Sequence, residues 1–313
     1  MRAATGQRGT RTCGARLHRA PPRGGRGLLP LAAMLCAVLA GCERPAVAWE
    51  EPQRHTAAAG AADSLSGPAL SGGAEVADVA VLAAGDGGRR APPPANDATA
   101  PPDAGGRRCE ASLRLAWSAD ATGRPQTYAA WWAVRPDSSA LLVAARSDDG
   151  GATWARTLAV DTLDRSGRGC ARPAPALAAD SVNGFVHVVY FMEAPEGPGV
   201  FYAHLMDPRA EFEPAAVVMY GERPSAASVA SRGDTVVVAY ENPNGDRPRV
   251  ELALSYRGGH RFDRRGILAS SPNSAAEAPS VALDGRRLAV AWVERHAAPS
   301  SPPTVVVRRG ELQ

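Results

Sequence analysis

A strand pattern that recurs about every fifty residues after Cys109 places the strongest constraint on how this 313-residue chain can fold. Each copy has a proline, a short apolar strand, a turn and a longer strand that ends in an aromatic residue. The copies are PALAADSVNGFVHVVYF from Pro175, PSAASVASRGDTVVVAYE from Pro224 and PSVALDGRRLAVAWVE from Pro279. β-Branched and aromatic runs between Gly, Pro, Asn and Asp turns predict short antiparallel strands, and no amphipathic helix pattern accompanies them. The chain is therefore expected to be all-β, with a period of about fifty residues, the length of one four-stranded propeller blade.

The repeat predicts about four blades, at residues 111–162, 172–220, 223–269 and 279–313. The last of these has only three predicted strands, and a propeller must close its ring to remove exposed strand edges. Three alternatives remain open. The apolar stretch Val76–Ala84 supplies the missing strand, the domain is an open propeller that dimerises, or the sequence is incomplete.

The segment SDDGGATW in the first predicted blade resembles the Asp-box, or BNR repeat, of sialidase-like propellers over residues 109–313. Its matching positions are Ser147, Asp149, Gly151, Thr153 and Trp154. A tight hairpin of this kind needs glycine where φ is positive, side-chain oxygens that accept hydrogen bonds from turn amides, and an aromatic ring between strands. The plainer alternative is an ordinary Asp-Gly hairpin.

A weaker copy of this turn, SYRGGHRF, follows the third predicted strand of a later blade. Ser255, Gly259 and Phe262 match the pattern, whereas Arg257 stands in place of the aspartate and Arg261 in place of the threonine. Its position along the blade is where a degenerate repeat is expected.

The resemblance to sialidases implies a site with three arginines, a tyrosine nucleophile activated by a glutamate, and an acid/base aspartate, on the face away from the Asp-box. The Arg-Ile-Pro motif that carries the first arginine is absent, and Arg124 lies between Gly and Pro instead. Tyr240 and Glu241 have the right residue types, but adjacent residues on a strand face opposite sides. We therefore expect Tyr240 to be the repeat's core aromatic, as Tyr190 and Trp292 are, and assign no catalytic residue.

The N-terminal segment predicts export and a lipid anchor. Seven arginines precede the apolar run Leu28–Ala40, which is too short to span a bilayer and ends in Leu-Ala-Gly-Cys at Cys42. This order resembles the bacterial lipobox, so residues 1–41 are expected to be a signal peptide and Cys42 to carry lipid at the membrane of the cell envelope, facing the periplasm or the exterior. The alternative is a buried thiol in a core helix. Residues 42–108, rich in Ala, Gly and Pro, are expected to form a disordered linker.

The remaining cysteines predict one disulfide. Cys13 and Cys36 leave with the signal peptide, so Cys109 and Cys170 are left as a pair, and an oxidising compartment favours their bonding. A zinc site is the weaker alternative, because the two thiols lack CxxC spacing and a nearby pair of histidines. The six histidines are scattered in sequence, so none is assigned to a metal and no cofactor is predicted.

The charge distribution argues against nucleic-acid binding. The formal charge of +3 becomes about −4 without the seven N-terminal arginines, and the remaining arginines alternate with acids rather than forming a stripe. The sequence favours a membrane-anchored propeller that binds a glycan or protein without catalysis. The alternative is a diverged exo-acting glycoside hydrolase of sialidase type.

Overall fold

The computed structural model describes residues 46–56, 106–119, 122–207, 210–269, 273–298 and 301–313. The expected signal peptide, Cys42 and the stretch Val76–Ala84 lie outside these residues. In the described part of the chain, no helix is long and apolar enough to cross a membrane.

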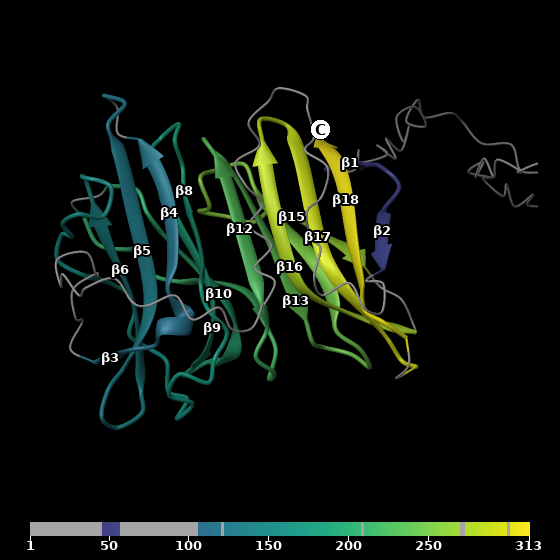
Figure 1. Ribbon diagram of the computed structural model, residues 1–313, viewed down its shortest axis with the longest axis horizontal. Helices are drawn as coiled ribbons and strands as arrows, with labels where there is room; N and C mark the ends of the chain where they lie inside the picture. The colour runs from purple at the N-terminus through teal and green to yellow at the C-terminus, as the bar shows by residue number, and fades with distance from the viewer. Residues whose placement is uncertain (1–45, 57–105, 120–121, 208–209, 270–272, 299–300) are drawn as a thin grey trace, which may run out of the picture. The chain divides into compact units, whose positions relative to one another are not determined.

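The described chain forms four antiparallel sheets (Figure 1). The first three are built from strands that follow one another in sequence, and the fourth also includes β1 and β2. The first contains β3 (Arg107–Arg108), β4 (Arg114–Ala119), β5 (Pro125–Val134), β6 (Ala140–Ser147) and β7 (Leu158–Asp161). The second contains β8 (Ala176–Ala179), β9 (Val186–Ala194), β10 (Gly197–Leu205) and β11 (Ala216–Tyr220). The third contains β12 (Ala227–Arg232), β13 (Thr235–Asn242), β14 (Arg249–Ser255) and β15 (Arg264–Ala269). The fourth contains β16 (Ser274–Asp284), β17 (Arg287–His296), β18 (Thr304–Leu312), β1 (Val47–Trp49) and β2 (Gln53–Thr56). A short 3-10 turn, η2 (Glu110–Ser112), precedes β4.

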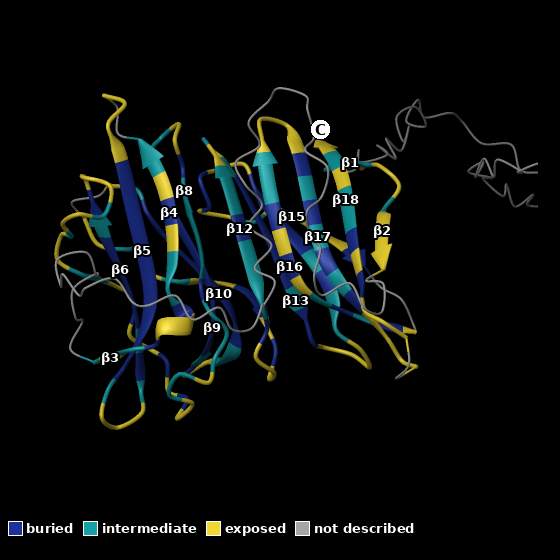
Figure 2. Ribbon diagram, in the orientation of Figure 1, coloured by how far each residue is buried: buried dark blue, intermediate teal, exposed yellow. Residues whose placement is uncertain are grey.

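The sheets pack on one another as the blades of a β-propeller do. Separate apolar clusters join the first sheet to the second, the second to the third, and the third to the fourth. The leading strands β4, β8, β12 and β16 contact one another in that order. Figure 2 shows the middle strands as the most buried, and β5 is buried along all but its first residue. The all-β propeller fold with four recognisable blades is therefore confirmed, and none of these clusters in the described residues joins the fourth blade to the first.

The fourth blade is completed by strands from the N-terminal side of the chain. Val47 pairs with Leu312 and Trp49 with Gly310, and β2 pairs with the other half of β18. A Cβ at Gly310 would lie 2.7 Å from Val47 Cγ1, so only glycine allows β1 to approach this closely. Both strands lie within residues 42–108, which were expected to form a disordered linker.

The predicted disulfide between Cys109 and Cys170 is present. Their Cα atoms are 5.4 Å apart, and Cys109 is buried in the cluster between the first two blades. The Cys109 amide also donates to the carbonyl of Trp132 at 2.9 Å. The bond therefore fastens the segment before β4 to the connection that leads into the second blade.

Candidate ligand-binding groove

The strand order gives every blade two ends, which carry different connections. Connections between second and third strands, such as 134–140, 194–197 and 242–249, lie at one end, together with the links to the next blade. We call this the groove end. Connections between third and fourth strands, such as 147–158 and 255–264, lie at the opposite end. Residues at the two ends of one blade are therefore separated by the length of a strand.

The turn at 147–154 has the hydrogen bonds expected from its sequence. Asp149 Oδ1 accepts from the Thr153 amide at 2.8 Å, and Asp149 Oδ2 accepts from the Thr153 hydroxyl at 2.6 Å. Ser147 donates to Asp149 Oδ1 at 2.7 Å and accepts from the Gly151 amide at 2.7 Å. Gly151 has φ +96°, and Trp154 packs, partly buried, against the cluster around Trp131. Hydrogen bonds to Thr153 hold the pKa of the Asp149 carboxyl at about 2.

The weaker copy at 255–262 keeps the backbone of this turn without the aspartate. Ser255 Oγ accepts from the Gly259 amide at 3.1 Å, and Gly259 has φ +94°. A Cβ on Gly259 would lie 1.7 Å from the Tyr202 hydroxyl, so the turn packs directly on the second blade. Both turns lie at the end opposite the groove end.

A groove of about 720 Å³ lies at the groove end, where connections of the second and third blades meet. The side chains that give it chemical character are one phenol ring, one amide, one guanidinium and two carboxylates: Tyr220, Asn244, Arg223, Glu196 and Glu222. Glycines and prolines form most of the remaining wall, so backbone groups lie close to the groove. We refer to these residues as the Tyr220 groove.

Local contacts hold Tyr220 in place while leaving it open to solvent. Its side chain extends over Gly197, where a Cβ would lie 3.6 Å from the ring. The ring meets Phe201 edge to face at 6.3 Å between centroids, yet Tyr220 remains 49% exposed. Asn244 donates to the Tyr220 carbonyl at 2.6 Å, and the Arg223 guanidinium donates to the carbonyl of Pro243. The amide and the guanidinium are thus fixed beside an accessible aromatic face.

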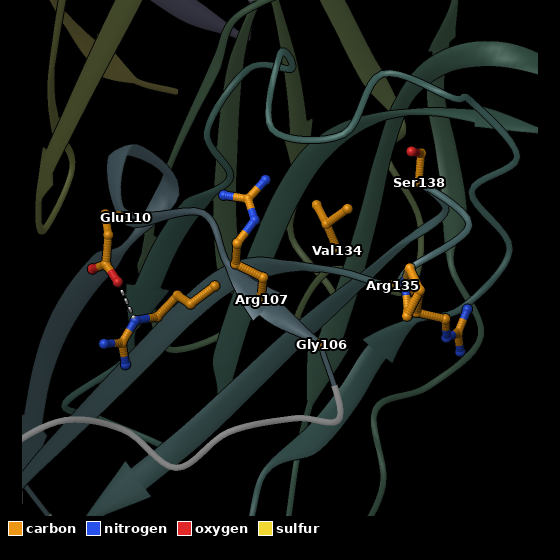
Figure 3. A pocket seen from close by; sticks show the side chains of 8 residues that line it. Gly106, Arg107, Glu110, Val134, Arg135 and Ser138 are labelled. Atoms are coloured by element: carbon orange, nitrogen blue, oxygen red, sulfur yellow. Dashed lines mark hydrogen bonds and ion pairs between the residues drawn. The ribbon is translucent and has the colours of Figure 1, made fainter.

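A second open pocket of about 880 Å³ lies at the groove end of the first blade (Figure 3). Arg107, Arg108 and Arg135 line it, and Arg108 pairs with Glu110 at 3.1 Å. No aromatic side chain contributes to its described wall. Its basic lining suits an anion better than a neutral ligand.

Tyr240 and Glu241 do not form a nucleophile and base pair. Tyr240 is only 1% exposed and donates to Glu251 Oε2 at 3.0 Å. Burial, followed by the charge of Glu251, raises the pKa of the Tyr240 hydroxyl to about 12. Glu241 is on the other face of β13, where burial raises the pKa of its carboxyl. The tyrosine is therefore a protonated core residue, as the strand pattern predicted.

Two groupings of polar side chains, the Tyr220 groove and a buried ion pair, were not predicted from the sequence. The Tyr220 groove draws on three separate connections, and its only sequence signal is their Gly-, Pro- and Asn-rich composition. A buried ion pair between Arg172 and Asp164, 2.6 Å apart, was also missed, and Arg172 lies 4.8 Å above the ring of Trp132.

Comparison with known proteins gives only distant structural similarities. No family model matches the chain, and no curated protein matches it either. A protein of unknown function from Dyadobacter fermentans has 14% identity and a TM-score of 0.46, with 63% of this chain and 52% of that chain covered. The endosialidase of phage phi92 has 10% identity and a TM-score of 0.44, with 63% and 35% covered. The α-L-arabinanase of Penicillium chrysogenum, solved with arabinobiose, has 13% identity and a TM-score of 0.39, with 60% and 57% covered. The chain thus spans between about a third and somewhat over half of these structures.

Proposed function

We propose that this protein is an exported lipoprotein, anchored in the bacterial cell envelope through lipid on Cys42, whose propeller binds a glycan in the Tyr220 groove without cleaving it. The observation that carries this proposal is the half-exposed ring of Tyr220 beside the fixed side chains of Asn244 and Arg223.

The groove offers the two kinds of contact that a sugar needs. The apolar face of a pyranose ring can stack on an exposed phenol, which is rigid and amphipathic. Hydroxyl groups can then bond to carboxylate, amide and guanidinium groups, which orient the ligand in an open cleft. The arginine-lined pocket of the first blade lacks the aromatic part of this combination in its described wall.

Export is supported by the cysteine chemistry and by the sequence of the N-terminus. Disulfides persist in oxidising compartments, and the Cys109–Cys170 bond fits a domain outside the cytoplasm. The lipobox-like sequence before Cys42 accounts for an anchor. In this proposal the turns at 147–154 and 255–262 are Asp-box turns with a scaffold role, at the end away from the ligand.

The burial of Tyr240 supports binding without cleavage, because a sialidase-type reaction needs an accessible tyrosine. A substrate cannot reach the Tyr240 hydroxyl, and the raised pKa of that hydroxyl keeps it a poor nucleophile. The hydrogen bond between Tyr240 and Glu251 is thus a core interaction.

A binding screen with a matched pair of variants tests the proposal. The full chain, purified in detergent, is passed over immobilised bacterial and plant polysaccharides, and the bound ones are titrated by calorimetry. We expect Tyr220→Ala to weaken binding about tenfold or more, since aromatic anchors dominate such sites. Tyr256→Ala, which removes a 38% exposed ring at the opposite end, should leave binding unchanged.

Two results would contradict the proposal. Equal affinity of Tyr220→Ala and the unmodified chain would remove the groove as the site. Release of new reducing ends during incubation, abolished by Tyr240→Phe, would favour the glycoside hydrolase instead.

A further inference from the structure

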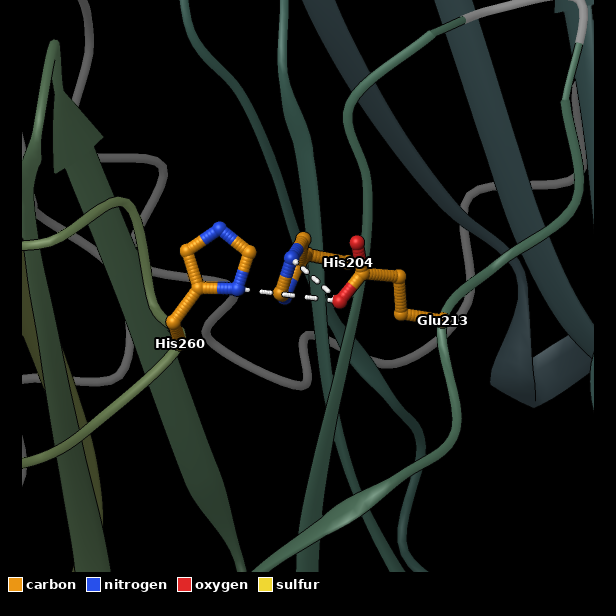
Figure 4. A group of neighbouring side chains, drawn as sticks. All are labelled: His204, Glu213 and His260. Carbon is orange, nitrogen blue, oxygen red and sulfur yellow. Dashed lines mark ion pairs between the residues drawn. The ribbon is translucent and has the colours of Figure 1, made fainter.

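Three potential metal ligands from two blades meet at the end of the propeller opposite the Tyr220 groove (Figure 4). His204 comes from β10, Glu213 from the connection to β11, and His260 from the 255–262 turn of the third blade. Figure 4 shows both imidazole rings facing the carboxylate. His204 Nε2 lies 3.3 Å from Glu213 Oε2, and His260 Nδ1 lies 3.6 Å from the same oxygen.

Contacts outside the three ligands hold the segments that carry them beside one another. The Glu213 amide donates to the His204 carbonyl at 3.0 Å, which fixes the connection next to β10. Tyr202, two residues before His204, fixes the turn that carries His260. The Tyr202 hydroxyl donates to the Gly258 carbonyl at 3.4 Å. Tyr202 also meets Phe262 edge to face at 5.0 Å. The segments that carry Glu213 and His260 are therefore both fixed next to β10.

His204 Nε2 has no hydrogen-bond partner in the described structure. Its side chain is 5% exposed, and Nε2 faces the Glu213 carboxylate without the geometry of a hydrogen bond. Neutral imidazole is the form of histidine that binds metals. A buried polar atom without a partner is costly, and a cation between the imidazole and the carboxylate would satisfy both.

We propose that His204 Nε2, Glu213 Oε2 and His260 Nδ1 bind one Zn²⁺ ion. Two imidazoles and one carboxylate form a ligand set that zinc accepts, with bonds of about 2.0 to 2.2 Å. Tetrahedral geometry with such bonds places ligand atoms about 3.3 to 3.5 Å apart. The two separations from Glu213 Oε2 are close to this spacing, and all three ligand atoms lie within 4.8 Å of one another.

The exposure of the ligands indicates what the ion would do. Glu213 and His260 are 39% and 48% exposed, so the fourth coordination position is open to solvent. The ion would bridge the second blade to the third, at the end opposite the Tyr220 groove. It therefore acts as a clamp between blades, stabilising the folded state in proportion to its occupancy.

Zinc binding to variants of the full chain tests this site. Any unprocessed chain would keep free thiols at Cys13, Cys36 and Cys42, which compete for the metal, so thiols are first alkylated and the protein is then stripped with EDTA. Titration against a chromophoric zinc chelator should then reveal one site per chain, and zinc should raise the unfolding temperature. We expect Glu213→Gln and His260→Gln each to weaken binding about tenfold or more and to remove the thermal shift. His296→Gln, at an exposed histidine of β17, should bind as the unmodified chain does.

Near-ultraviolet circular dichroism of each variant shows whether it is folded. Glu213 and His260 are both partly exposed, so we expect both variants to fold. If one of them does not fold, the zinc affinity of the other tests the site. Absence of zinc binding by the unmodified chain would overturn the proposal. So would a folded Glu213→Gln or His260→Gln variant with unchanged affinity.

Discussion

In each of the three repeat copies, one core aromatic donates its polar hydrogen to a carboxylate. Tyr190 donates to Asp161 at 2.6 Å, Tyr240 to Glu251 at 3.0 Å, and the Trp292 indole to Glu294 at 3.3 Å. Burying a hydroxyl or indole N–H without a partner would cost free energy, so these acids complete the core. The strand pattern predicted the aromatics, but their acids come from other strand positions with no fixed spacing and could not be assigned from sequence.

Glu241 is a carboxyl group whose charged form the fold disfavours, because burial raises its pKa. The folded state then holds the proton more tightly than the unfolded state, so stability falls as the pH rises above the ordinary value of 4.5. We predict that Glu241→Gln raises the unfolding temperature at pH 7 and that the gain disappears near pH 4. Thermal melts at both pH values, with the exposed Glu311→Gln as control, measure this. A less stable Glu241→Gln protein at pH 7 would show that the charge is well solvated.

Asp149 should have the opposite pH dependence. Its folded pKa of about 2 is lower than the ordinary 3.8, so its contribution is complete above pH 3.8 and is lost as the pH falls through about 2. We predict that Asp149→Asn is less stable than the unmodified chain at pH 7, and that the difference shrinks as acid is added. Denaturant unfolding at pH 7 and at pH 2.5 tests this. A difference that is constant with pH would show that the carboxylate charge contributes nothing.

The elements of each blade were predictable where their strands are long and apolar. TVVVAY, within β13, and LAVAWV, within β17, carry enough β-branched and aromatic residues to be recognised alone. The strands β1 and β2 are short, with the sequences VAW and QRHT, and β2 is exposed throughout. They form because β18 offers an open edge, which is a tertiary property. The Tyr220 groove could not be predicted for the same reason, since its walls come from connections whose meeting depends on how blades pack.

The 147–154 turn gives one prediction at this scale. Trp154 is partly buried against the cluster around Trp131, so Trp154→Ala should cost less than a full core truncation, about 2 to 3 kcal/mol. Glycan binding should fall only with the folded fraction, because the turn lies at the end opposite the groove. Urea unfolding and calorimetric titration give the two quantities. Loss of binding by a well-folded variant would place the turn in the site.

Gly310 gives a second prediction, on the attachment of β1. A side chain there would meet Val47, Trp49 and the backbone of Ala48 at less than 3 Å, so Gly310→Val should displace β1 from β18. Amide hydrogen exchange of residues 47–49 should accelerate, while the first three blades keep their protection. Unchanged exchange in β1 would mean that the strand tolerates the added side chain.

At the scale of the whole molecule, the first and fourth blades each have an attachment beyond their own consecutive strands. The disulfide ties the first blade to its connection, and the N-terminal strands complete the fourth. The number of blades could be predicted from the fifty-residue period. That residues 47–49 and 53–56 complete the fourth blade could not. The lipid anchor remains a prediction from the sequence before Cys42.

The anchor is tested by metabolic labelling with palmitate in a bacterial host. Cys42→Ser should abolish labelling, because the sulfur of Cys42 is the atom expected to carry the lipid. Cys36→Ser, within the apolar run, should label normally. Labelling that persists in Cys42→Ser would remove the anchor.

Hydrogen exchange of the full chain with and without its best-binding polysaccharide tests the central claim most directly, because it locates the ligand. We predict slower exchange in the connections 194–198, 220–223 and 243–245, with no change in the turns at 147–154 and 255–262. Slower exchange confined to the arginine-lined pocket at 106–110 and 134–138, or to the two turns, would contradict glycan binding in the Tyr220 groove.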